Sequence, residues 1–424
     1  MNRDGHQLNL LGGFTQQSSS YQSLGAEAQG FLNDNLGTNA LGNAASVQPS
    51  SSSIARWALL SFLGRANYSF RNKYLLTLTG RYDGSSRFGK NNRFGFFPSV
   101  AVGWKADQEP FIRDLHVFSN LKLRVSHGLT GNQDGIGNYP SLDLMGKANY
   151  SVGGVNVIGL APSQVGNPDL RWESTAQSDI GLELGFFNNR LTFITDAYYK
   201  KTSDLLLYVK IPTTSGFSTS LQNRGQVENK GIEFTVNATP IDKEVHWETG
   251  FNISLKRNKV LDLAGVNRLF AGLGPNQSTV VQVGQPLGTF FGFAADGIFS
   301  TKEEVAASAQ KTAKPGDIRF RDVNGDKKIN DDDRVLLGNA QPKFSFGFSN
   351  TFSLKGFDLM ILLQGVYGNK LYNINTNTLE NLTGLQNQST TTLNRWTPDN
   401  THTNIPQATT VKPTPRSWDR QVED

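Results

Sequence analysis

The segments of this chain that alternate apolar with polar residues are joined in turn by very short and very long connections. Within 74–83, Tyr74, Leu76, Leu78, Gly80 and Tyr82 alternate with the polar residues Thr77, Thr79, Arg81 and Asp83. The same period of two recurs within 121–130, where His127 falls on the apolar face, and within 179–184. This alternation places the two sets on opposite faces of a β-strand. A soluble β-sandwich would show the same alternation, so the lengths of the connections have to distinguish the two folds.

The connections differ greatly in length. The tight turns are 70–74, 186–191, 240–245 and 354–357. The long polar stretches are 17–56, 83–95, 131–169, 203–227 and 259–342. Short turns at one end and long loops at the other are typical of an outer-membrane β-barrel. Aromatic residues beside the short turns match a girdle at a lipid interface, although aromatic caps on a sandwich core would look alike.

The expected fold class is therefore all-β: a transmembrane antiparallel β-barrel, incomplete, with long extracellular loops. The expected strands are 7–16, 57–70, 73–82, 96–106, 120–131, 171–186, 190–202, 228–239, 245–257, 343–354 and 357–367. Each is long enough for the ~9–11 residues that a tilted membrane strand needs. The chain is 37% hydrophobic and has no apolar run of ~18 residues, which excludes a helical membrane protein.

Several functional classes find little support in the sequence. The net charge of +5 is spread along the chain, so we expect no nucleic-acid partner. The five histidines are dispersed, and neither a His-Glu-x-x-His nor a Gly-x-Ser-x-Gly motif is present. The segment 84–90 fits a P-loop up to Lys90, but Asn91 replaces the Ser or Thr that would hold Mg²⁺. We therefore expect no enzyme.

A series of short motifs runs along the whole chain in one order. They are Leu63–Tyr68, Arg81–Gly89, Phe97–Val100, Leu121–Arg124, Thr130–Gln133, Asn167–Glu173, Tyr199–Leu206, Asn229–Glu233, Pro315–Asp322 and Gln364–Asn369. Together they make the chain resemble the SusC/RagA-type TonB-dependent outer-membrane transporters. The resemblance implies a plugged barrel of roughly 22 strands, of which this chain would supply roughly eleven. Residues 1–424 would then be a partial TonB-dependent receptor β-barrel domain.

The resemblance also implies partners and a location. They are a SusD-like surface lipoprotein acting as a lid, the TonB–ExbB–ExbD complex, outer-membrane lipid, and the outer membrane of a Gram-negative, Bacteroidota-like cell. The sequence shows no plug, TonB box or signal peptide, and it stops before the last strands, so we expect a fragment. The implied function is import of oligosaccharides or peptides, with substrate-binding residues unassigned. A passive porin and a secreted soluble β protein that binds Ca²⁺ or glycan remain alternatives.

The connection 259–342 has content of its own. We expect a structured extracellular excursion, with a strand near 287–293 and a short helix near 301–310. No resident cofactor is expected apart from Ca²⁺. The spacing of Asp322, Asn324, Asp326 and Asp333 is that of a Ca²⁺-binding loop. Lys327 stands where such loops prefer glycine, and an Asx-rich turn that holds its own backbone would give the same pattern.

Aromatic residues in the long connections offer a further reading. Phe217, Phe270 and Trp396 have the chemistry to stack on a sugar ring. Aromatic residues in loops more often pack locally, so both interpretations stay open at this point.

Overall fold

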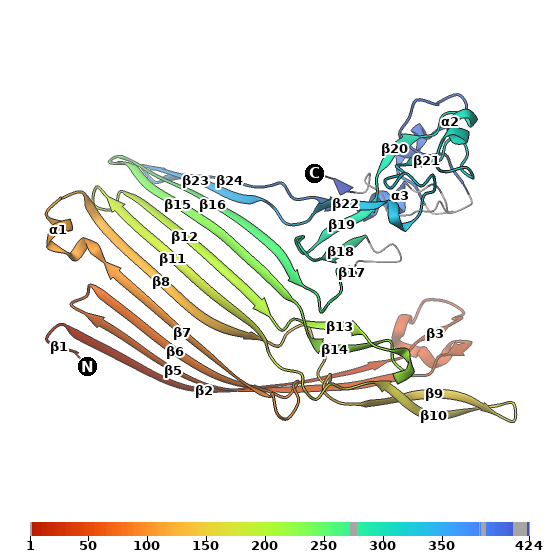
Figure 1. Ribbon diagram of the computed structural model, residues 1–424, viewed down its shortest axis with the longest axis horizontal. Helices are drawn as coiled ribbons and strands as arrows, with labels where there is room; N and C mark the ends of the chain where they lie inside the picture. Colours follow the sequence, from red (N-terminus) through yellow and green to blue (C-terminus); the bar gives the residue numbers. More distant parts are fainter. Residues whose placement is uncertain (1, 272–277, 381, 383–386, 410–421, 424) are drawn as a thin grey trace. The chain divides into compact units, whose positions relative to one another are not determined.

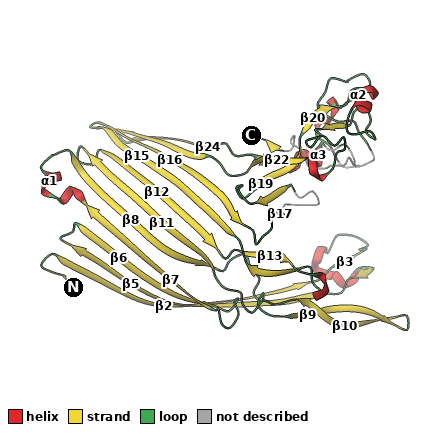
Figure 2. Cartoon of the chain, viewed as in Figure 1, coloured by secondary structure: helices red, strands yellow, loops and turns green. Residues whose placement is uncertain are grey.

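Long strands dominate the fold of this chain (Figures 1 and 2). The computed structural model describes residues 2–271, 278–380, 382, 387–409 and 422–423. One sheet has twelve strands in the order β1-β2-β5-β6-β7-β8-β11-β12-β15-β16-β23-β24, and among the described residues it is not closed. Its strands are β1 Asn2–Arg3, β2 His6–Gly25, β5 Ser51–Phe70, β6 Tyr74–Ser85, β7 Phe94–Lys105, β8 Phe118–Asn132, β11 Glu173–Phe186, β12 Leu191–Ser203, β15 Gln226–Asp242, β16 Val245–Asp262, β23 Phe344–Leu354 and β24 Phe357–Tyr367. All the expected strands are present, which confirms the all-β fold class.

The tight turns lie where the sequence predicts them. In three of the four turns, residues adopt the left-handed backbone region, with φ of 50° at Arg71 and 55° at Asn72, and of 54° to 62° across 187–189. Between β23 and β24, Lys355 has a φ of 51°. Left-handed residues let a strand reverse within two or three residues. Consecutive long strands are therefore neighbours in the sheet.

The connection expected at 17–56 is largely wrong. Strands β2 and β5 are paired without interruption from His6↔Phe70 to Gly25↔Ser51, so only 26–50 connects them. The extension is rich in Ser and Gln, and the Ser23 and Ser53 hydroxyls lie 2.7 Å apart across it. Because it is polar on both faces, it lacks the alternation that marks a strand in the sequence. Two short strands, β3 (Ala28–Gln29) and β4 (Ser46–Val47), pair within the remaining connection.

Two further long connections, 131–169 and 203–227, contain hairpins that the sequence does not predict. Strands β9 (Leu144–Val152) and β10 (Val155–Gln164) pair through the tight turn at Gly153 and Gly154. Strands β13 (Leu206–Lys210) and β14 (Thr219–Asn223) form the second hairpin. A 3-10 turn at Thr213–Ser215 lies between them. The long connections are thus largely β-structure themselves.

The connection 259–342 contains two small sheets. The first has the order β17-β18-β19-β22 and the second pairs β20 with β21. These strands are β17 Arg268–Ala271, β18 Thr279–Gln282, β19 Thr289–Phe293, β20 Ala295–Ile298, β21 Ile318–Phe320 and β22 Arg334–Asn339. Helix α2 (Lys302–Ala307) begins at Thr301, whose hydroxyl accepts a hydrogen bond from the Glu304 amide. Strand β19 and helix α2 lie inside the ranges 287–293 and 301–310.

The described helices are short and lie in connections, as Figure 2 shows. Helix α1 (Pro110–Arg113) and a 3-10 turn at Ala106–Gln108 join β7 to β8, and α3 (Ile374–Leu379) follows the short strand β25 (Leu371–Tyr372). Strand β25 pairs with β26 (Val422–Glu423). No described helix combines the length and the apolar character needed to cross a membrane.

The chain packs as two compact units, which are described separately below. The first unit comprises residues 1–104, 124–178 and 202–225. The second comprises residues 105–123, 179–201 and 226–424.

Candidate functional site

The strands of the first unit present one apolar and one polar face. Cross-strand pairing aligns Leu10 with Ala66, Ala66 with Leu78, and Leu78 with Val100 in one row. Leu10 is 74% exposed and Leu78 is 47% exposed, so this face is apolar and uncovered. The predicted alternation within 74–83 is confirmed, because the polar residues of that segment all lie on the opposite face.

The polar face of the first unit is a lattice of paired side chains. Arg81 Nε donates to both carboxylate oxygens of Asp83, at 2.7 and 2.8 Å, and its Nη2 donates to the Ser61 hydroxyl at 3.1 Å. Asp83 and Ser61 are both buried. Two residues further along β6, on the same face, the Thr79 hydroxyl accepts a hydrogen bond from Arg65 Nε at 3.2 Å. Charges held this way keep a strand surface polar without leaving a buried group unsatisfied.

The second unit repeats this division. Lys122 Nζ on β8 lies 3.1 Å from Glu183 Oε1 on β11, and both side chains are about three-quarters covered. Leu182, the adjacent residue on β11, is 37% exposed and points to the other face. The expected placement of Leu182 and Glu183 on opposite faces is therefore confirmed.

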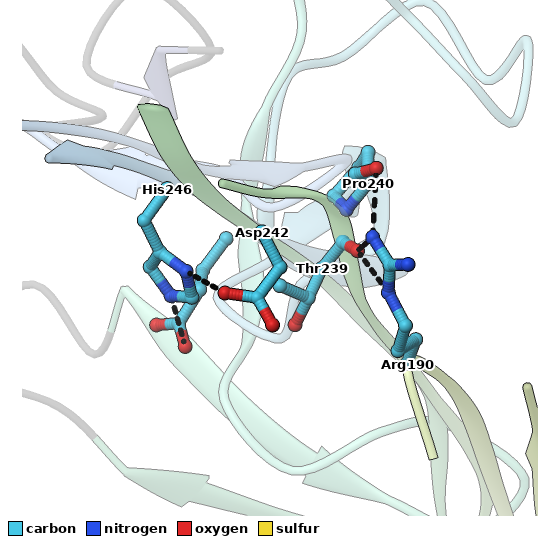
Figure 3. A network of polar contacts seen from close by, with 6 residues as sticks. Arg190, Thr239, Pro240, Asp242 and His246 are labelled. Atoms are coloured by element: carbon cyan, nitrogen blue, oxygen red, sulfur yellow. Dashed lines mark hydrogen bonds and ion pairs between the residues drawn. The ribbon is translucent and has the colours of Figure 1, made fainter. Parts of the chain in front are cut away.

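A polar hollow lies at the short-turn end of the second unit. Its volume is about 290 Å³, and its lining includes Arg190, Asn237, Glu248, Ser349 and Thr351. The Arg190 guanidinium donates to the Thr239 carbonyl at 3.0 and 3.2 Å and to the Pro240 carbonyl at 3.1 Å (Figure 3). These bonds tie the last residues of β15, just before its turn to β16, to the residue that precedes β12.

The His246 imidazole lies beside this hollow, between two carboxylates. Nδ1 is 3.0 Å from Asp242 and Nε2 is 3.1 Å from Glu248 (Figure 3). Sequence reasoning did not single out His246 or Arg190. Both residues lie next to a tight turn, and that position is the feature of the sequence that could have identified them.

Three long connections of the first unit share a small apolar core. Phe88, Leu170, Trp172 and Leu221 are buried together. The Trp172 indole donates to the Arg93 carbonyl at 2.9 Å, and the Asn167 side chain donates to the Leu221 carbonyl at 2.9 Å. The motif Asn167–Glu173, which carried part of the family resemblance, is thus a structural clamp for the loops.

Two further contacts belong to the same clamp. A Cβ built on Gly89 would lie 1.8 Å from the Pro168 carbonyl oxygen, so only glycine fits there. The glycine of the P-loop-like segment therefore serves chain packing, not phosphate binding. The Arg171 guanidinium lies 2.7 Å from Asp204 and hydrogen-bonds to it, which raises the pKa of Arg171.

The connection 259–342 has its own aromatic and cationic core. The guanidinium carbons of Arg268 and Arg334 lie 4.5 and 4.6 Å from the centroid of the Phe291 ring. Burial lowers the pKa of Arg334, the charge of Arg268 lowers it further, and Asp331 opposes both. Phe270 packs 5.8 Å from Phe291, and Trp396 packs against a neighbouring apolar cluster of β19, β20 and β21. Both rings therefore make local contacts, and Phe270 also leaves 49% of its surface exposed.

The acidic loop 322–333 is held by its own backbone. Asp322 accepts from the Gly325 and Lys327 amides at 2.7 and 2.8 Å, and the fully buried Asp333 accepts from the Val323 and Asn330 amides at 2.9 and 2.8 Å. In further contacts, the Asp326 amide donates to Asn324 Oδ1 at 2.9 Å and the Lys328 amide donates to Asp326 Oδ1 at 2.8 Å. Lys327 has a φ of 62°, the conformation that favours glycine at this place. Across the described part of the chain, no three His, Cys, Asp or Glu side chains are arranged around a common metal position. The Ca²⁺ site stays a prediction.

Known protein families and relatives match most of this chain. Residues 2–394 match the family described as TonB dependent receptor-like, beta-barrel. TonB-dependent receptor P26 of Formosa agariphila is 38% identical over 412 residues, which cover 96% of this chain and 41% of the relative. TonB-dependent receptor SusC of Bacteroides thetaiotaomicron is 36% identical over 330 residues, covering 75% of this chain and 32% of the relative.

Solved structures agree with these relatives. A structure described as the RagAB peptide transporter matches with a TM-score of 0.81 and 29% identity, covering 100% of this chain and 45% of that chain. The RagAB peptide importer in an open-open state matches with a TM-score of 0.80 and 30% identity, over 99% and 44% of the two chains. The chain therefore spans less than half the length of the proteins that it matches.

Proposed function

The chain belongs to the TonB-dependent receptor β-barrel family, and we propose on that premise that the protein containing it is an active importer of the outer membrane. The observation that carries the proposal is the division of the strands into two faces. The apolar face of Leu10 and Leu78 suits lipid. The face of Arg81, Asp83 and Glu183, with its ion pairs, suits a water-filled lumen.

The proposed cargo is a bulky polar nutrient, either an oligosaccharide or a peptide. The lumen-side lattice offers charged and hydroxyl groups in close succession, as Arg81, Asp83 and Ser61 illustrate. Such a wall can exchange hydrogen bonds with a polar solute. The RagAB structures are described as those of a peptide transporter and importer, which supports the peptide alternative.

The proposed partners follow from the same family. Energy would come from the TonB–ExbB–ExbD complex, and a SusD-like surface lipoprotein would close over the end of the barrel that carries the long connections. We place 259–342 at that outer end, because the short turns would then face the periplasm. The proposed location is the outer membrane of a Bacteroidota-like cell.

Energy dependence separates this proposal from a passive porin. Cells that carry the intact protein should take up labelled oligosaccharides or peptides, and a protonophore should abolish the uptake. Uptake that continues at the same rate after the proton gradient has collapsed would instead identify a porin.

Two other classes are set aside. The relatives are receptors and transporters, and the chain is not an enzyme. Membership of a membrane-barrel family also leaves no room for the alternative of a secreted soluble β protein.

We propose Ca²⁺ binding at Asp322, Asn324, Asp326 and Asp333 as a separate, local property of the connection 259–342. The support is the spacing of the four residues and the left-handed backbone at Lys327, which reproduces the sharp turn of a Ca²⁺ loop. The bound ion would stiffen the connection and leave the barrel wall unchanged.

A further inference from the structure

A groove crosses the apolar face of the first unit. Its volume is about 820 Å³, and its floor is a row of three glycines and one proline. Strand pairing aligns Gly12 with Gly64, Gly64 with Gly80, and Gly80 with Pro98, so the row spans β2, β5, β6 and β7. At a strand spacing of ~4.8 Å this floor is ~14 Å long.

The walls of the groove are apolar rows on either side of the floor. On the short-turn side stand Leu10, Ala66, Leu78 and Val100, and on the other side stands Phe96, which is 61% exposed. The Phe96 ring belongs to an aromatic row with Phe14, Phe62 and Tyr82, aligned by the same pairing. The groove is therefore a furrow between an aliphatic and an aromatic ridge.

No contact among the described residues explains why two of these positions are glycine. A Cβ built on Gly12 or on Gly64 meets no atom within 4 Å, and neither residue has a positive φ. Glycine inside a strand weakens it, and often marks a place where a ligand or another backbone approaches closely. The open space above Gly12 and Gly64 is the space that such a ligand would fill.

The position of the groove relative to a bilayer follows from two aromatic rows. Phe70, Tyr74 and Trp104 form one row beside the short turns, and Phe62, Tyr82 and Phe96 form the second, eight residues further along each strand. Eight residues rise ~26 Å, or ~20 Å along the normal for a strand tilted by ~40°. The rows are therefore spaced like the two aromatic girdles of a membrane barrel, and the groove lies just inside the outer one.

A polar pair stands at the end of the groove. His127 lines it, and its Nδ1 lies 2.9 Å from the Ser178 hydroxyl, with both residues exposed. Polar side chains on a lipid-facing surface are costly unless they are hydrogen-bonded. The second ring nitrogen, Nε2, offers a further bond to a hydroxyl, ester or amide of a ligand.

We propose that this groove is a fixed binding site for one acyl chain of an outer-leaflet glycolipid, lipid A, with the polar group of that chain beside His127. The inference rests on the outer-membrane placement proposed above. The groove is continuous with the apolar face that would meet lipid, and it lies on the outer-leaflet side of that face. A narrow furrow with a bare floor fits a flexible chain. Because barrel strands are tilted, a furrow perpendicular to them is inclined, so a chain that descends from the leaflet can follow it.

The test fills the groove in the intact outer-membrane protein. Gly64→Leu places a side chain in the open space, and Gly13→Leu is the matched control. A Cβ on Gly13 meets only Leu63, at 3.8 Å, and Gly13 faces the opposite side from Gly12. Each protein is purified from outer membranes in mild detergent, and its retained lipid A and phospholipid are quantified by mass spectrometry. Wild type and Gly13→Leu should retain lipid A through washing, whereas Gly64→Leu should retain several-fold less.

Each alternative result overturns the proposal. The contrary results are that Gly64→Leu keeps the wild-type amount of lipid A, that it loses only phospholipid, or that it changes oligomeric state without losing lipid. The last result would assign the groove to a second copy. If Gly64→Leu does not fold, a photoactivatable residue at Leu10 should cross-link lipid A, and one at Thr77 on the polar face should not. Absence of the Leu10 cross-link also refutes the site. Energised uptake by Gly13→Leu and wild type is measured in parallel, so that failure of the lipid site and failure of the proposed transport are distinguishable.

Discussion

Leu182 and Glu183 should respond in opposite ways to a change of charge. Leu182→Arg would place a guanidinium on the lipid-facing side of β11. Leu182 lies four residues from Phe186 at the turn, which is ~10 Å along the membrane normal and near the middle of an apolar band ~25 Å tall. At that depth an arginine costs about 2–4 kcal/mol of folding free energy.

Glu183→Gln should cost less. The change removes the ion pair with Lys122, whose atoms lie 3.1 Å apart, but both side chains remain on the polar face. Exposed and partly exposed pairs of this kind contribute about 0.2–1 kcal/mol. A double-mutant cycle with Lys122→Gln isolates that contribution, because the two residues are in direct contact.

The assay is the folding equilibrium of the intact barrel in lipid vesicles, followed by denaturant titration for each variant. We expect Leu182→Arg to be the more destabilising variant by at least about 1 kcal/mol. Equal costs, or a greater cost for Glu183→Gln, would show that the two faces of β11 have been assigned the wrong way round.

Three further predictions concern the connections. Trp172→Ala should destabilise the loop core by about 3–5 kcal/mol and speed hydrogen exchange at 83–93. Trp172→Phe loses mainly the hydrogen bond to the Arg93 carbonyl and should cost about 1 kcal/mol. Equal hydrogen exchange in the two variants would contradict the proposed clamp. Ala307→Cys, at an exposed site in the connection 259–342, should react with an impermeant maleimide on whole cells. Lys355→Cys, at a short turn, should not react, and the reverse pattern of labelling would invert the proposed topology. Millimolar Ca²⁺ should slow hydrogen exchange across 322–333 in the wild type and in Asp331→Ala, but not in Asp326→Ala. The Ca²⁺ proposal fails if hydrogen exchange in the wild type does not change.

Strands with one apolar and one polar face are predicted from the sequence, whereas strand segments that are polar on both faces are not. From Leu76 onward strand β6 alternates between an apolar and a polar face, so the predicted limits of 73–82 lie close to the observed Tyr74–Ser85. The outer half of β2 is polar on both sides and was expected to be a loop. Backbone pairing with β5 and the Ser23–Ser53 hydroxyl contact hold that part of the strand, and neither produces an alternation that a sequence pattern reveals.

The same reasoning applies to the sites. Spacing alone suggested the acidic loop, because its residues are neighbours in sequence. The contacts of Trp172 with Arg93 and of Lys122 with Glu183 join residues 79 and 61 positions apart. Such contacts depend on which strands lie side by side, so a single sequence does not reveal them. The groove over Gly64 is of this kind, since its floor comes from four different strands.

The unbroken pairing of β2 with β5 has a consequence for how this protein can vary. Twenty consecutive residue pairs run from His6↔Phe70 to Gly25↔Ser51 without a bulge. Inserting one residue near Leu63 would shift every later pair by one position and turn each side chain beyond it to the opposite face. Apolar residues would then point into the lumen and polar residues into lipid. We therefore expect gains and losses of length to be tolerated within 26–50 and not within the paired strands.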